Sequence, residues 1–326
     1  INQQRLRRAD PHYRMIDDGL EYLAAGDDTS AEPLLVAGLK VRPSYAEGWG
    51  GLGLIRLRQG RHGEAHELLL KALRGDPDNT EKWRSLANTA HYWQHLRDAQ
   101  AAIEAGQFDN AKKHLKALSV LDTNEVAGRS AWGDWAAGQQ LWKLAERYYR
   151  QALTIDPLHS NSLYGLLRLW QTQGDEQQTL SALQSLSRPQ QQLLAAERSR
   201  IEAARLRKDA DLALTEERLE YAAVQLQQAL SLDPNNPWLR FDLAQLHVRL
   251  GREESGHDLL SARLSDPQSQ QELHYAYGLF LASLDQDQAA LASVSQIPPS
   301  ERSAGMNALL TRINTNITLR EVEQQN

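Results

Sequence analysis

Apolar residues recur at three- and four-residue spacing along most of the chain, which is the spacing of one face of an α-helix. Gly marks the middle of many of these segments, and Asp-Pro or a similar pair marks the end. Strand signals are nearly absent, because the chain lacks alternating Val, Ile or Thr runs and Asn-Gly hairpin turns. The pattern therefore predicts an all-α fold built from pairs of helices.

The helical segments repeat every 34 residues. Units 12–45 and 46–79 align with each other, and so do the contiguous units 92–125 and 126–159. A 34-residue helix–turn–helix unit with this pattern resembles the tetratricopeptide repeat. The residues at signature positions of that repeat are Trp49, Gly53, Ala65, Ala72, Pro77, Gly133, Ala145, Pro157, Ala222 and Pro234.

These residue types suit the places they would hold in stacked hairpins. Gly53 and Gly133 are expected where the second helix crosses the first closely, with small residues such as Ala65 opposite. The prolines stop the second helix because Pro has no backbone N–H. No single hairpin buries its apolar face, so the units are expected to stack into a right-handed superhelical solenoid with one continuous core. Glycines expected at the turn between the two helices are Gly26, Gly60, Gly106, Gly174 and Gly251.

Two irregular segments interrupt the period. Residues 80–91 are helical by pattern and are expected to lengthen the first helix that follows them. The register breaks again around Pro189. We therefore expect an N-terminal solenoid over 1–187, an irregular helical break or hinge over 188–202, and a second solenoid over 203–326 that ends in a capping helix.

Composition excludes several classes of function. The 326-residue chain is 41% hydrophobic and 24% charged, as folded soluble proteins are. Its net charge of −6 argues against a nucleic-acid partner, which would need clustered Lys and Arg. The chain has no cysteine, so disulfides, thiolate metal sites and cysteine nucleophiles are excluded.

Two pairs of histidines have metal-ligand spacing. His62 and His66 are four residues apart, and so are His91 and His95. The helical motif of zinc proteases needs Glu directly after the first His, but Gly63 follows His62. The chain also lacks a Gly-rich phosphate loop and a nucleophile elbow. We therefore expect neither a metal nor a cofactor, and no enzyme activity.

Three longer segments resemble one particular family. The stretches WRSLANTAHYWQHLRDAQAAIEAGQFDNAKKHLKAL, AERYYRQALTIDP and HYAYGLFLASLDQDQAALASVSQIP are similar to the repeat region of cellulose synthase operon protein C. That family supplies the outer-membrane subunit of bacterial cellulose export. The resemblance extends over residues 12–326. It implies a periplasmic chain that is part of a longer protein, attached to the outer membrane only through a C-terminal β-barrel outside this sequence.

The resemblance also implies a function. The chain would be a non-catalytic scaffold that links the outer-membrane pore to the inner-membrane synthase. Its partners would be other subunits of the complex, with cellulose or peptidoglycan as further ligands. Two alternatives stay open: a peptide-binding adaptor or co-chaperone, and a scaffold of another exopolysaccharide secretion system. An adaptor would clamp a C-terminal carboxylate with several Lys and Arg residues, whereas this chain has only scattered ones, such as Arg58.

In this repeat family, fixed positions of each first helix line a concave groove. Carried over position by position, the candidate contacts are Trp93, Gln100, Asn161, Tyr164, Arg168, Trp238, Phe241 and Arg249. Aromatic faces beside amide and Arg donors could stack on and hydrogen-bond a glucan. The alternative is that each aromatic ring covers a hydrophobic step between repeats. Tryptophans expected in the core are Trp49, Trp132, Trp142 and Trp170.

Overall fold

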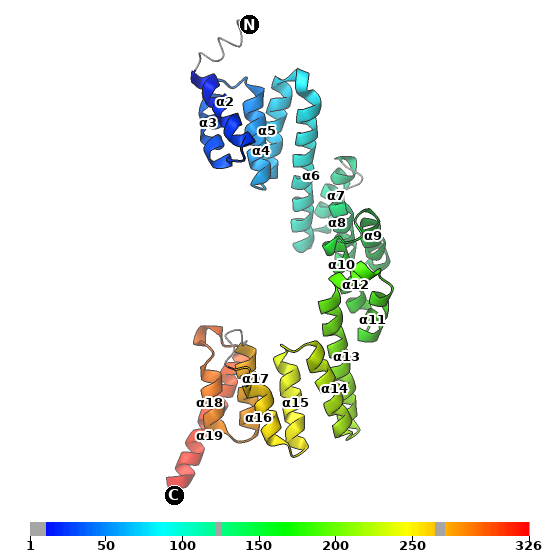
Figure 1. Ribbon diagram of the computed structural model, residues 1–326, viewed down its shortest axis with the longest axis vertical. Coiled ribbons are helices and arrows are strands. Elements are labelled where there is room, and N and C mark those ends of the chain that lie inside the picture. Colours follow the sequence, from blue (N-terminus) through cyan, green and yellow to red (C-terminus); the bar gives the residue numbers. More distant parts are fainter. Residues whose placement is uncertain (1–10, 122–125, 265–270, 326) are drawn as a thin grey trace. The chain divides into compact units, whose positions relative to one another are not determined.

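The computed structural model describes residues 11–121, 126–264 and 271–325 of the chain (Figure 1). Over these residues the backbone forms α-helices joined by short turns, two single-turn 3₁₀ helices, and no β-strand. The all-α fold predicted from the hydrophobic spacing is confirmed.

The chain divides into two compact units, Ile1–Leu169 and Trp170–Asn326. The helices of unit 1 are α2 (Pro11–Ala24), α3 (Asp28–Val41), α4 (Ala46–Arg58), α5 (His62–Gly75), the 3₁₀ turn η1 (Pro77–Asn79), α6 (Thr80–Glu104), α7 (Phe108–Leu121), α8 (Val126–Gly138), α9 (Trp142–Ile155) and most of α10 (Ser160–Gln173). Consecutive helices from α2 to α9 pair as antiparallel hairpins in the predicted 34-residue units.

Unit 2 continues with helix pairs of the same kind. Its elements are α11 (Glu176–Gln184), α12 (Arg188–Leu193), α13 (Ala195–Thr215), α14 (Leu219–Leu232), α15 (Pro237–Arg249), α16 (Glu253–Ser261), α17 (Gln271–Ser283), α18 (Asp287–Ser295), η2 (Pro299–Glu301) and α19 (Ala304–Gln325). The helix α19 packs on α18, because Met306, Leu309 and Ile313 are buried against the apolar residues of α18, and its role as a cap stays a prediction.

The division between the compact units lies at a different place from the expected break, and the expected domain bounds stay a prediction. The division falls inside α10, between Leu169 and Trp170, and not at 188–202. The expected break is itself helical, because α12 and α13 are separated only at Leu194, which is 1% exposed. Whether 188–202 acts as a hinge stays a prediction.

Glycines lie at the helix crossings, as expected. A Cβ atom on Gly53 would lie 2.7 Å from Cγ of Leu69, and one on Gly133 would lie 2.5 Å from the ring of Tyr149. In both hairpins the two residues are 16 apart, so the repeat register sets the contact. The small residues opposite are fully buried: Ala65, Ala72, Ala111, Ala145 and Ala222.

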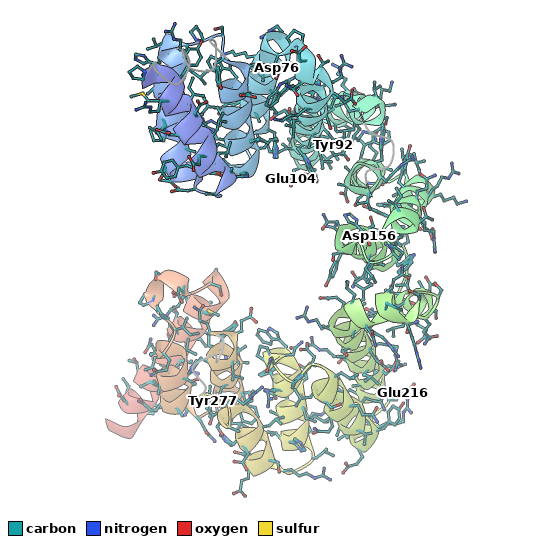
Figure 2. All side chains as sticks on the ribbon, turned by 45° about the horizontal axis from the view of Figure 1, so that its top comes forward. Asp76, Tyr92, Glu104, Asp156, Glu216 and Tyr277 are labelled. Atoms are coloured by element: carbon teal, nitrogen blue, oxygen red, sulfur yellow. The ribbon has the colours of Figure 1, made fainter. Side chains whose placement is uncertain are left out.

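The second helices end two residues before the signature prolines. α5 ends at Gly75 before Pro77, and α9 and α14 end in the same way before Pro157 and Pro234. The residue between, such as Asp76 with φ −137° and ψ 79°, has left the helical region because a following Pro disfavours it. Asp76 and its counterpart Asp156 are labelled in Figure 2.

Four of the five turn glycines adopt the left-handed conformation. Gly60 has φ +70°, and Gly26, Gly106 and Gly251 lie close to it. Gly174 also lies in its predicted turn, between α10 and α11, but it is not among the residues with positive φ. Three other turns use residues with a side chain in this conformation, at φ 59° to 60°: Gln140, Glu217 and Asp285.

Residues 80–91 form the first half of α6, a single helix of 25 residues (Figure 1). The expected lengthening of the following first helix is confirmed. The insert is anchored by Trp83, which is 2% exposed and covers Gly50 of α4. Its indole N–H donates to a carboxylate oxygen of Asp76 at 2.9 Å.

Candidate functional site

Three of the candidate groove residues lie on one open face of α10. Asn161, Tyr164 and Arg168 are separated by three and four residues, so they share a side of the helix. All three are exposed, and 39% of Tyr164 is accessible. The opposite side of the helix is buried in the core through Leu163, Leu166, Leu167 and Leu169.

Arg168 forms an ion pair with Asp134 of α8, with an N–O distance of 3.8 Å. The two residues are 34 apart, because each occupies the ninth position of its repeat. Asp134 was not among the sequence candidates, although the same position carries Gln100 and Arg168 in the neighbouring repeats. The repeat register was the signal that could have found it.

A buried tyrosine forms a hydrogen bond with Asp134. The hydroxyl of Tyr149 on α9 donates to Oδ1 of Asp134 at 2.7 Å. Burial raises the pKa of Asp134, and the Tyr149 hydrogen bond and the charge of Arg168 oppose that rise. The Tyr149 ring is 1% exposed and lies between Gly133 and Gly165. It therefore joins three helices beneath the exposed residues.

On α6, Trp93 and Gln100 are seven residues apart and both exposed. Trp93 is 39% exposed and makes edge-to-face contacts with His62 at 6.3 Å and with Tyr92 at 5.5 Å between ring centroids. Tyr92, labelled in Figure 2, is buried. The open side of α6 therefore carries an aromatic ring and an amide.

In unit 2 the aromatic candidates are more enclosed. Trp238 and Phe241 of α15 are half-buried and pack against a core cluster that contains Leu260 and Phe280. Trp238 also meets Tyr275 of α17 edge-to-face at 5.9 Å. This geometry favours the alternative in which the rings cover a step between repeats. The remaining candidate, Arg249, is exposed.

The core tryptophans divide into two groups. Trp49, Trp132, Trp142 and Trp170 are half-buried. Trp49 packs between two repeat cores, and its indole N–H donates to the carbonyl of Pro43 at 2.7 Å. Trp83 and Trp135, which the signature did not single out, are more deeply buried.

Two models of the tetratricopeptide repeat match the chain, over residues 16–80 and 213–274. The first matched region contains the signature residues Gly53 and Ala65, and the second contains Ala222 and Pro234. The chain has the tetratricopeptide-repeat fold. No helix in the described parts of this repeat protein combines the length and the apolar character needed to cross a membrane.

Curated proteins that are similar to this chain include cellulose synthase operon protein C from several bacteria. Cellulose synthase operon protein C of Xanthomonas axonopodis pv. citri (strain 306) is 33% identical over 307 residues, which is 92% of this chain and 20% of that protein. The protein of the same name from Pseudomonas fluorescens (strain SBW25) is 30% identical over 301 residues, 92% of this chain and 23% of its own length. That of Escherichia coli (strain K12) is 28% identical over 321 residues, 98% of this chain and 28% of its own.

The resemblance to this family is therefore confirmed along nearly the whole chain. The chain spans only 20% to 28% of the length of these relatives. It is a repeat protein similar to one part of a protein of cellulose synthesis.

Proposed function

We propose that this chain is a non-catalytic periplasmic scaffold of a bacterial cellulose synthesis and export complex. It links the outer-membrane pore to the inner-membrane synthase through contacts with other subunits. The observation that carries the proposal is similarity to cellulose synthase operon protein C over about nine-tenths of the chain. The repeat fold supports it, because stacked hairpins present extended surfaces for contact.

The surface that we assign to the partner is the open face of α10 together with its support on α8. Tyr164 and Arg168 lie on the side of α10 opposite its buried leucines. Asp134, which pairs with Arg168, accepts a hydrogen bond from the Tyr149 hydroxyl. Aromatic and Arg side chains are enriched where proteins bind one another. A rigid support lowers the entropy cost of ordering these side chains on binding.

Ion pairs of two groove arginines, Arg58 and Arg168, argue against the adaptor alternative. A clamp for a C-terminal carboxylate needs Lys and Arg side chains that are available to the ligand. Arg58 instead pairs with Asp28, and Arg168 pairs with Asp134.

The test reverses one charge in the full-length gene of the host bacterium. Arg168→Glu places two acidic groups together at the proposed contact and is expected to reduce cellulose secretion, measured as dye-binding glucan, at normal protein abundance. Arg147→Glu is the matched control, because Arg147 is exposed on α9, a second helix. Equal secretion from both variants and the wild type would refute the assignment of this face. Unchanged secretion after deletion of residues 12–326 would refute the scaffold.

We further propose direct contact with the glucan, on the observation that Trp93 and Tyr164 are each 39% exposed and share a helix side with the exposed amides Gln100 and Asn161. Aromatic faces pack against the apolar faces of sugar rings. Titration of cello-oligosaccharides is expected to change tryptophan fluorescence in the wild type and less so in Trp93→Phe. Absence of a response at millimolar sugar would remove glucan contact and leave the protein scaffold standing.

A further inference from the structure

Four histidines from three consecutive helices of unit 1 lie in a row. His66 of α5 stacks on His91 of α6, and His91 lies beside His95, with 4.3 Å between ring centroids in both pairs. His95 in turn faces His114 of α7, at 5.1 Å between centroids. The chain has ten histidines, so a large share of them meets at one place.

One end of the row has the geometry of a metal site. His95, Asp98 and His114 each offer a ligand atom, and these atoms all lie within 4.8 Å of one another. Nδ1 of His95 and Nδ1 of His114 are 2.9 Å apart. Tetrahedral zinc with Zn–N bonds of about 2.0–2.1 Å separates two nitrogen ligands by about 3.3 Å. The rings would therefore need to part by only a few tenths of an ångström.

The helices hold these three side chains in position. His95 and Asp98 are three residues apart, so they point to the same side of α6. The side-chain amide of Gln94 donates to both oxygens of Asp98 at 2.8 Å. Such outer partners orient a ligating carboxylate in known metal sites. His114 is brought to this side by the pairing of α6 with α7.

The chemical state of the rings suits metal binding. Burial lowers the pKa of His95, and the neighbouring charge of His114 lowers it further, against the opposing effect of Asp98. Burial also lowers the pKa of His91, assisted by His66 and His95. A neutral imidazole keeps the lone pair that a metal needs. His66 is engaged elsewhere, because its Nδ1 lies 2.9 Å from the carbonyl oxygen of Ala87.

We propose that His95, Asp98 and His114 bind one divalent zinc-class ion that joins α6 to α7, with water at the fourth position. Two imidazoles and a carboxylate match zinc and its transition-metal neighbours, whereas magnesium and calcium prefer all-oxygen sites. The ion would fix the hairpin whose first helix carries Trp93 and Gln100. The expectation of no metal came from spacing within single helices, and this site is made across two.

The test is calorimetric titration of zinc into the full chain after treatment with a chelator. One saturable site per chain is expected at micromolar zinc, and Co²⁺ should give the visible absorption of a four-coordinate ion. Loss of an outer-shell partner typically weakens a metal site by about 10- to 100-fold, so Gln94→Leu should fall in that range. His95→Ala and His114→Ala should weaken binding at least as much.

The matched control is His12→Gln, because His12 lies on α2, which packs on α3 and α4. This variant should bind zinc like the wild type. Circular dichroism establishes that each variant is folded. If an alanine variant does not fold, Asp98→Asn, which keeps the size of the side chain, replaces it as the test of a ligand. Absence of saturable binding to the wild type would overturn the proposal, and so would unchanged affinity in folded variants of all three ligands. Neither result depends on a role in cellulose secretion.

Discussion

Replacement of Tyr149 by Phe tests how the candidate surface is supported. Phe keeps the ring that fills the space between Gly133 and Gly165 and removes only the hydroxyl that donates to Asp134 at 2.7 Å. A hydrogen bond to a charged group contributes about 1.5–3 kcal/mol. We expect Tyr149→Phe to lower the free energy of unfolding at pH 7 by about that amount.

The loss should depend on pH in a defined direction. Burial already raises the pKa of Asp134 above its ordinary value of 3.8, and the Tyr149 hydrogen bond counters that rise. Without the hydroxyl the pKa rises further, so the folded state holds the ionised carboxylate less well. The full loss is therefore expected at neutral pH, and it should shrink as the pH falls towards 4 and Asp134 takes up a proton.

The assay is urea unfolding followed by far-ultraviolet circular dichroism at pH 7 and pH 4. In thermal unfolding, a loss of this size corresponds to a fall in Tm of roughly 3–12 °C for a unit of this length. Tyr148→Phe is the control, because Tyr148 is the adjacent tyrosine and stacks on Trp132 at 5.6 Å between centroids. Equal losses in the two variants at pH 7, or a Tyr149→Phe loss that grows at pH 4, would refute the reasoning.

Three other changes have expected outcomes in the same assay. Gln140→Gly should raise the free energy of unfolding by about 0.5–1 kcal/mol, because relief of the left-handed conformation outweighs the entropy gained by the unfolded chain. Gly60→Ala should lower the free energy of unfolding, and a change of the same sign in both variants would contradict this reasoning. Gly53→Ala should cost about 1–3 kcal/mol by overpacking, since its Cβ would lie 2.7 Å from Leu69, and an unchanged midpoint would show that the crossing can widen. The raised pKa of Asp134 predicts that the wild type loses stability as the pH rises from about 4. Asp134→Asn should remove that loss, so the free energy of unfolding of this variant should change less between about pH 4 and 7 than that of the wild type.

The repeat register predicted the features that depend on backbone spacing. Gly53 meets Leu69 because a residue without a side chain is required where two helices cross, and that requirement recurs every 34 residues. The stop before Pro77 follows from backbone chemistry alone. The same register could have predicted the Asp134–Arg168 pair, since equivalent positions of adjacent first helices are neighbours.

The remaining features depend on packing between different helices. His95 and His114 are 19 residues apart, and nothing in a helical period along one segment brings them together. Gln140 occupies a glycine-type turn without the residue that normally marks it. The boundary between the compact units lies inside a regular helix, between two consecutive apolar residues, Leu169 and Trp170.

The length of α6 has a consequence for how unit 1 unfolds. In most repeat arrays each hairpin is a separate block, so loss of structure can stop at the loop between two blocks. Here one helix of 25 residues, about 37 Å long, packs against α5 of the preceding hairpin and against both α7 and α8. Damage to either neighbouring hairpin strips contacts from the same continuous helix, so the cooperative melting unit extends across that boundary.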